Sequence, residues 1–240
     1  MRVGELITVI REDYLNDKNS RKYRWDDASL LRRIDEAQRQ ACNRTNLIYD
    51  DSTSLFTRIA MVSGKPGYKF SDKITVIKNV LLGGKILNKR SVESMDKETP
   101  LWRANSGQVN QTVEYVIQGR TLRVTFIPND LDVVVTPYIN LEVYRLPDNT
   151  INNVNQQFEI PEENQLDLAH WVLHSCYKKV DADTFNQEKS DYHLLRFNQI
   201  FGQPVSALVR QHQFESTGSL NITPAGLKRH RSTSDDPAEW

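Results

Sequence analysis

The sequence is poor in cysteine, in long apolar runs and in excess charge of either sign. Only Cys42 and Cys176 occur among 240 residues, so a disulfide framework is not expected. Each falls on the apolar stripe of a predicted helix, where a thiol behaves as a small hydrophobe. We therefore expect two free, buried thiols rather than a bridge or a reactive nucleophile.

No apolar run is long enough to span a bilayer, and charges scattered through residues 1–14 interrupt the apolar core that a signal peptide needs. Lys plus Arg equals Asp plus Glu, 31 against 31, so no global charge attracts nucleic acid or an anionic membrane. These absences predict a cytosolic protein that has no membrane partner.

The composition nevertheless suffices for a folded core, since 38% of the residues are hydrophobic. Apolar residues at helical spacing predict a first helix over residues 3–14, which ends at the polar cluster from Asn16 to Ser20. A second helix follows, with Asp26 or Asp27 as its N-cap. Its expected apolar face is Leu30, Leu31, Ile34, Ala37, Ala41 and Cys42.

Residues 55–146 change to short β-branched and aromatic runs separated by Gly, Pro and Asn, which is typical of a meandering antiparallel sheet. The expected strands are Leu55–Met61, Lys73–Leu82, Val113–Ile117, Thr121–Ile127 and Val133–Tyr144. Gln118-Gly119-Arg120 supplies a tight turn between the third and fourth strands. Pro137 predicts an edge position or a bulge in the last strand, because proline cannot donate to a ladder.

Two further helices are predicted after a polar link. The first begins at Pro161, since proline suits the first helical position and acidic residues follow it. Its expected stripe is Leu166, Ala169, His170, Leu173, Cys176, Tyr177 and Val180. The second begins at a capping box of Thr184 and Gln187 and ends at Gly202 and Pro204. Its expected apolar residues are Phe185, Tyr192, Leu195 and Ile200.

These elements predict an α+β fold in which N- and C-terminal helices build one helical domain around an inserted antiparallel β-rich region. The expected boundaries are 1–50 for the N-terminal helices, 51–147 for the β-rich domain, 148–212 for the C-terminal helices and 213–240 for an extended C-terminal tail. The tail is rich in Ser, Thr, Pro, Gly and charge, so we expect it to be disordered until a partner surface orders it.

The motifs that could carry chemistry are incomplete. His170 and His174 share one helix face at a metal-binding spacing, but Trp171 stands where a zincin has its glutamate. Gly83-Gly84-Lys85 lacks Walker spacing and is interpreted as a hairpin turn. Four carboxylates at expected turns and helix N-termini are interpreted as caps or solvated charge. They are Asp130, Asp132, Glu162 and Glu163. We predict no catalytic residues, no cofactor and no metal.

The middle of the chain carries a distinctive order of turns and aromatic residues. It runs Gly67-Tyr68-Lys69-Phe70, Ile74 to Leu82, Gly83-Gly84-Lys85-Ile86-Leu87, Met95-Asp96, Pro100-Leu101-Trp102-Arg103, Gly107, Glu114-Tyr115, Leu122 to Pro128, and Tyr144-Arg145-Leu146-Pro147. This order resembles the β-region of the head-to-tail adaptor (connector) proteins of tailed bacteriophages. The stretches Asp27–Cys42 and Trp171–Phe201 occupy the places of the family's flanking helices, so the resemblance covers residues 20–202.

The resemblance implies a non-enzymatic virion protein of the neck region. Such adaptors form closed homo-oligomeric rings, commonly dodecamers, between the portal protein and the tail or nozzle proteins. DNA passes through the ring during ejection without specific binding. Zero net charge suits that passage, because a channel lined with lysines would hold the phosphate backbone.

Arg, Trp and Tyr dominate protein-interface hot spots. We therefore take the candidate interface residues from the places where such residues cluster. The candidates are Arg21, Tyr23, Arg24, Trp25, Trp102, Arg103, Leu227, Lys228, Arg229, Arg231 and Trp240. The clusters Arg21–Trp25 and Lys228–Arg231 also have the basic character of single-strand binders. A nucleic-acid-binding accessory module that uses these two patches is therefore the alternative. Acidic pairs follow both patches and dilute their charge, which favours the protein interface.

Overall fold

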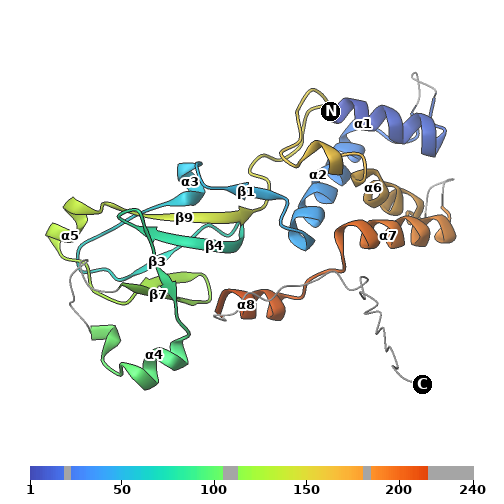
Figure 1. Ribbon diagram of the computed structural model, residues 1–240. Coiled ribbons are helices and arrows are strands. Elements are labelled where there is room, and N and C mark those ends of the chain that lie inside the picture. The colour runs from blue at the N-terminus through green and yellow to red at the C-terminus, as the bar shows by residue number, and fades with distance from the viewer. Residues whose placement is uncertain (19–22, 105–112, 181–184, 216–240) are drawn as a thin grey trace, which may run out of the picture.

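The computed structural model describes residues 1–18, 23–104, 113–180 and 185–215. Figure 1 shows a helical body at one end of the molecule and a β-rich region at the other. The chain leaves the helical body through one short strand and returns to it from one long strand. The α+β class predicted from the sequence is confirmed.

The helical body takes its elements from both ends of the chain. They are α1 (Val3–Val9), the π-helix η1 (Ile10–Leu15), α2 (Asp27–Arg44), the 3₁₀ helix η3 (Glu162–Asn164), α6 (Leu168–Tyr177) and α7 (Gln187–Phe201). Asn16 ends η1 in the left-handed region at φ 50°, within the predicted turn cluster. The Asp26 carboxylate accepts a hydrogen bond from Ser29 N at 2.5 Å, so Asp26 is the N-cap of α2 as predicted.

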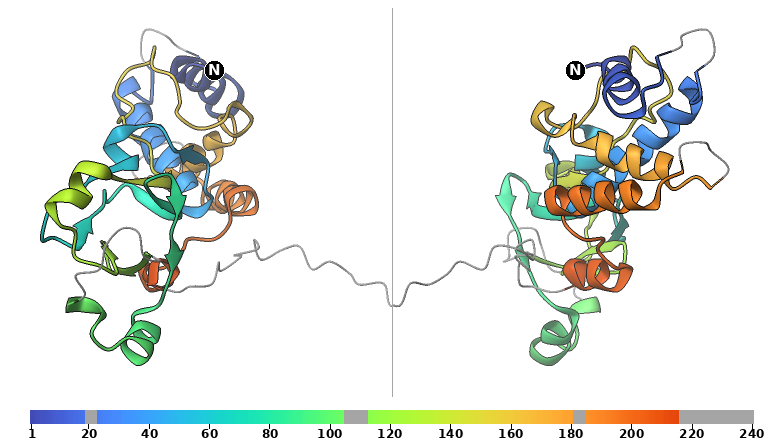
Figure 2. Two further views of the ribbon diagram at one scale, coloured as in Figure 1. Left: turned by 60° about the vertical axis from the view of Figure 1, so that its left-hand side comes forward. Right: turned by 90° about the vertical axis from the view of Figure 1, so that its right-hand side faces the viewer.

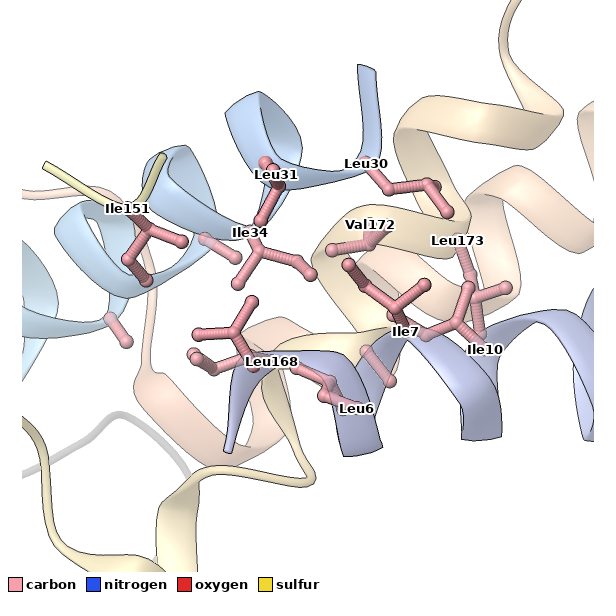
Figure 3. Packing of buried hydrophobic residues seen from close by; sticks show 14 of the residues in the cluster. Leu6, Ile7, Ile10, Leu30, Leu31, Ile34, Ile151, Leu168, Val172 and Leu173 are labelled. Carbon is pink, nitrogen blue, oxygen red and sulfur yellow. The ribbon is translucent and has the colours of Figure 1, made fainter. Parts of the chain in front are cut away.

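Helix α6 is the centre of this body, since none of its residues is exposed. Leu168, Val172 and Leu173 point into the core between α1 and α2 (Figure 3). The opposite side of α6 faces α7, where His174 Nδ1 lies 3.0 Å from Ser190 O. Each large aliphatic side chain buried here stabilises the fold by about 2 kcal/mol. Cys42 and Cys176 are free and buried, as predicted.

Two predictions for the C-terminal helices are wrong in detail. The continuous helix begins at Leu168 rather than Pro161, because the first acidic turn forms only η3. Leu166 and Val180, assigned to the stripe, are consequently exposed at its two ends. Asn186 caps α7 by accepting from Lys189 N at 2.9 Å, and Thr184 lies outside the described residues.

The predicted apolar face of α7 is turned outward. Phe185, Tyr192, Leu195 and Ile200 are all exposed. The buried residues of α7 are Ser190, His193, Phe197 and Phe201. The reason is that α7 is apolar on two faces, and the two phenylalanines fill the space beside Trp171 of α6 and Arg44 of α2. Helical periodicity identified an apolar face but could not decide which face the subunit buries.

The β-rich region contains two small sheets around a second hydrophobic core. Its strands are β1 (Ile48–Asp50), β2 (Arg58–Ala60), β3 (Gly67–Lys69), β4 (Ile74–Leu82), β5 (Lys85–Ile86), β6 (Asn88–Lys89), β7 (Glu114–Gln118), β8 (Thr121–Val124) and β9 (Tyr138–Arg145). Its short helices are α3 (Ser54–Thr57), α4 (Val92–Glu98), the 3₁₀ helix η2 (Trp102–Ala104) and α5 (Asp130–Val135). One sheet has the order β1-β9-β4-β5, with β2 also on β9, and the other the order β3-β8-β7-β6.

The predicted meander is wrong, because β4 pairs with β9 from the far end of the region and β6 pairs with β7 in parallel. Helices α3 and α5 replace the first parts of two predicted strands. In α5 a capping box of Asn129 and Asp132 overrides the β propensity of three valines. Pro137 does not mark an edge: it precedes β9, which is central, and its carbonyl accepts from Met61 N at 2.9 Å. The turn at Gly119 between β7 and β8 is confirmed, with φ +57°.

Helix α8 (Ala207–Glu215) lies against β4 and β7, outside the helical body (Figure 2, left). Phe214 is buried with its ring centroid 5.5 Å from that of Phe70. The guanidinium of Arg120 lies over both rings, at 5.1 and 5.3 Å from their centroids. One turn earlier in the helix, Arg210 donates to Asn43 Oδ1 of α2 at 3.0 Å, so α8 contacts both bodies. The predicted tail starts inside this helix, and residues 216–240 lie outside the described part of the chain.

A buried ion network closes the junction between the two bodies. Arg145, the last residue of β9, pairs with Asp50 of β1 at 2.6 Å and with Glu159 at 2.7 Å. Burial alone would raise the pKa of Asp50, but hydrogen bonds from Thr53 and Arg145 outweigh it and lower that pKa. Burial would also raise the pKa of Glu159, but hydrogen bonds outweigh it and lower that pKa, and Arg145 is the strongest donor.

Replacement of Arg145 by Met should lower the free energy of unfolding by about 3 kcal/mol, because the buried carboxylate of Asp50 and the partly buried carboxylate of Glu159 lose their cation. Urea denaturation followed by circular dichroism measures this change. The matched control is Lys73→Met, which removes the 2.5 Å ion pair with Asp148 at a half-exposed position. That variant should lose no more than about 1 kcal/mol. Equal losses in the two variants would contradict a special role of the junction.

Candidate protein-interface surfaces

The predicted cluster from Arg21 to Trp25 is divided between the surface and the core. Tyr23 and Arg24 are exposed, whereas Trp25 is buried in the helical core of its own subunit. Arg21 lies outside the described residues. Trp25 is therefore not presented to another molecule, and only Tyr23 and Arg24 of this cluster stay candidates for an interface.

A second buried cation explains why this cluster folds inward. Arg11 donates to Trp25 O at 2.6 Å, pairs with Asp27 at 2.8 Å and lies 3.8 Å from the ring centroid of Tyr23. Asp17 accepts from Trp25 N at 3.2 Å. A buried guanidinium needs such carboxylate, carbonyl and aromatic partners, and the cluster supplies them. The basic and aromatic residues here thus act partly as internal structure.

Trp102 and Arg103 form a second internal assembly. Trp102 is buried in a small core between α4 and β7, and its Nε1 donates to Asp96 Oδ1 at 2.8 Å. Arg103 pairs with the same carboxylate, and its guanidinium lies 4.5 Å from the Trp102 ring centroid. The hydrogen bond from Arg103, followed by that from Trp102, lowers the pKa of Asp96. Arg103 is half-exposed, so it remains available for an interface, whereas Trp102 is not.

The remaining candidates belong to the C-terminal segment, outside the residues that the structure describes. They are Leu227, Lys228, Arg229, Arg231 and Trp240. Their roles at an interface stay predictions.

Two exposed apolar surfaces were not recognised as interfaces in the sequence. Tyr192 and Leu195 on α7 are each 54% exposed. Leu131, Val134 and Val135 on α5 are between 66% and 77% exposed at the end of the β-rich region farthest from the helical body (Figure 1). Exposed apolar groups that gather on one face mark contact sites more often than scattered ones. The sequence signal was present as helical periodicity in α7 and as an apolar run in α5, but the first was predicted only as the apolar residues of a helix and the second as the start of a strand.

The predicted pair of His170 and His174 does not converge. His170 Nδ1 instead lies 2.9 Å from His193 Nδ1 of α7, and His174 Nδ1 lies 3.0 Å from Ser190 Oγ. Burial, followed by the positive charge of His170, lowers the pKa of His193 to about 4. His193 also stacks on Tyr177, with ring centroids 5.8 Å apart. In the described ranges no group of three or more His, Cys, Asp or Glu is placed to hold a metal ion.

The other chemical candidates have local structural roles. Gly83 and Gly84 form the β4–β5 turn with φ +55° and +79°, which confirms the hairpin interpretation. Asp132 completes the capping box of α5, and Glu162 pairs with the N-terminal amine at 3.2 Å. No helix within the described residues has the length and apolar character to cross a membrane.

The fold thus presents the surfaces of a structural subunit, with its polar clusters used in internal packing and apolar residues on both bodies exposed. Residues 1–222 match the family model of the SU10 adaptor protein. The chain belongs to this family of phage adaptor proteins, and it is a structural virion adaptor of the neck whose partners are portal and tail proteins. No curated protein matches the chain.

The burial of His193 beside His170 should make the stability depend on pH. In the unfolded chain His193 titrates near its ordinary pKa of 6.5, but in the fold that pKa is about 4. The unfolded state therefore binds the proton first, and this group should remove about 2 kcal/mol of stability as the pH falls from about 6.5 to about 4.5. His193→Phe should abolish that part of the slope, measured by urea denaturation across the pH range. His212→Phe, at an exposed position on α8, should retain it.

Proposed function

We propose that the chain forms a closed ring that joins the portal to the tail and leaves a channel for DNA. A dodecamer fits the symmetry common among head-to-tail adaptors. The helical body builds the wall of the ring, and the β-rich region reaches the tail or nozzle proteins. The C-terminal segment, from residue 216 onward, wraps a neighbouring ring, and Leu227, Lys228, Arg229, Arg231 and Trp240 are its contact residues.

The observation that carries this proposal is the exposure of apolar side chains on both bodies of one subunit. The α7 surface belongs to the helical body, and the α5 surface lies at the far end of the β-rich region. Burial of such side chains against partners is favourable by about 25 cal/mol per Å² of apolar area. Two surfaces on different bodies support two kinds of contact, one within a ring and one along the neck axis.

The charge of the chain also supports passage of DNA without specific binding. Basic and acidic residues balance at 31 each, so the subunit offers no net charge to hold phosphates. The alternative, a nucleic-acid module, depends on basic and aromatic side chains that reach the surface together. In the Arg21–Trp25 patch the tryptophan is buried, which weakens that alternative.

Electron microscopy of the purified chain mixed with portal rings from the same virus tests the proposal. We expect an added ring, coaxial with the portal, whose class averages show cyclic symmetry and an open centre. Absence of any portal-bound ring would contradict the proposal. Tight, salt-dependent binding of DNA by the purified chain would instead support the nucleic-acid alternative.

Val134→Glu tests the role assigned to the β-rich region. The charge should prevent burial of the α5 surface, so portal-bound rings should form while tail attachment is lost. Leu55→Glu is the matched control, because Leu55 is exposed on α3 of the same region and does not belong to α5 or to the candidate interface residues. Particle assembly with normal tails in the Val134→Glu variant would contradict the assignment. A normal melting temperature in both variants excludes misfolding as the cause.

A further inference from the structure

The outward face of α7 has the residue spacing of a helix–helix seam. Glu188, Tyr192, Leu195 and Gln199 follow one another at intervals of four, three and four, and all are exposed. Residues at these intervals form one stripe along an α-helix. The two apolar members stand in the middle and the polar members at the ends, as in an interface with an apolar centre and a polar rim.

A second stripe of exposed residues lies on α2. The core side of this helix carries Leu30, Ile34 and Ala41, and the opposite side carries Arg32 and Glu36. No large apolar residue of α2 is exposed. This face is therefore hydrophilic, but the stems of its long side chains can cover apolar groups of a partner.

Helix α6 separates these two stripes. Its Leu168 and Val172 side faces α1 and α2, whereas its His170 and His174 side faces α7. Figure 2 (right) shows α7 crossing the helical body in front of the other helices. The outward faces of α2 and α7 are therefore both turned away from α6, and the two helices meet near their C-terminal ends, where Arg44 donates to Asn198 Oδ1 at 2.6 Å. One copy can present α7 to one neighbour and α2 to another.

We propose that the α7 seam, defined by Glu188, Tyr192, Leu195 and Gln199, docks on the outward face of α2 of a second copy of this chain. The inference rests on the proposed ring and names the contact that builds it. In successive copies, α7 of each subunit then lies against α2 of the next. The contact is heterologous, so it joins each subunit to two neighbours and can close into a ring.

Charge complementarity favours a second copy as the occupant. Glu188 at the start of the seam is acidic, and Arg32 on the outward face of α2 is basic. In a parallel docking that sets Glu188 opposite Arg32 these two charges attract, and Tyr192 lies one turn further along, level with the stem of Glu36. Tyr192 and Leu195 then pack on the stems of these long side chains. Such an interface leaves the free subunit soluble because its α2 half is polar and its α7 half contains two large apolar residues.

Two variants and their mixture test the contact. Leu195→Glu damages the α7 seam, and Arg32→Glu damages the α2 face; each should raise the concentration for half-maximal self-association about tenfold or more. An equal mixture should form dimers but no larger species, because one intact seam meets one intact α2 face and neither end can then grow. Analytical ultracentrifugation measures the species. Leu208→Glu, at an exposed site on α8, is the control and should assemble like the unmodified chain.

The inference would be overturned if Leu195→Glu or Arg32→Glu reached half-maximal self-association at the same concentration as the unmodified chain. So would a mixture that stays monomeric or that forms full rings. Absence of self-association in the unmodified chain up to about 1 mM would also count against it. If portal-bound rings still form when the contact is refuted, the proposed function stands and only this assignment fails; if no ring forms on the portal, the proposed function fails with it.

A photo-reactive benzophenone side chain at position 195 provides an independent readout. Irradiation of the assembled chain should join position 195 to a peptide from α2 of a second copy, identified by mass spectrometry. The same group at position 208 should give no such product. Cross-links from position 195 to another region, or none at all, would refute the assignment of α2 even if the substitutions weaken assembly.

Discussion

The fold depends on the junction at which one chain leaves the helical body and returns to it. Arg145 ends β9 and binds Asp50, which ends β1, together with Glu159 of the returning segment. An uncompensated charge at this buried place costs several kcal/mol, so the three groups constrain one another. Because β1 and β9 are also hydrogen-bonded neighbours, the network fixes where the sheet meets the helices. The position of the α5 surface relative to α7 follows from that constraint.

Local signals in the sequence predicted many elements well, because caps and turns act over a few residues. Asp26 caps α2, and Gly119 forms the predicted turn between β7 and β8. The helices predicted from the apolar spacing at α1 and α2 are present. Strand pairing was not predictable in this way. The partners β4 and β9 are distant in sequence, and nothing local encodes which of several apolar runs will be neighbours. The replacement of the start of one predicted strand by α5 has the opposite cause, a local cap that overrides β propensity, whereas α3 has no side-chain cap.

The candidate surfaces were harder to predict than the fold. Composition favoured Trp and Arg as contact residues, yet Trp25 and Trp102 are buried in their own subunit, each with an arginine guanidinium over its ring. Buried guanidinium groups need aromatic and carboxylate partners, so clusters of these residue types arise inside a subunit as readily as between subunits. Conversely, Tyr192 and Leu195 were predicted only as apolar residues of a helix, and they are exposed. A pattern shows that a face will be buried, but it does not show in which molecule.

The two faces of α7 connect these observations to assembly. Phe197 and Phe201 hold the helix on its own subunit, and this fixes Tyr192 and Leu195 in an outward direction. A helix anchored so firmly cannot rotate to hide its second face, because the rotation would expose two fully buried rings. The exposed face must therefore be covered from outside or remain in water at a cost. Since the outward face of α2 is polar and is also turned away from α6, each subunit has two unlike faces. Unlike faces repeat in one direction, which is the condition for a ring rather than a closed pair.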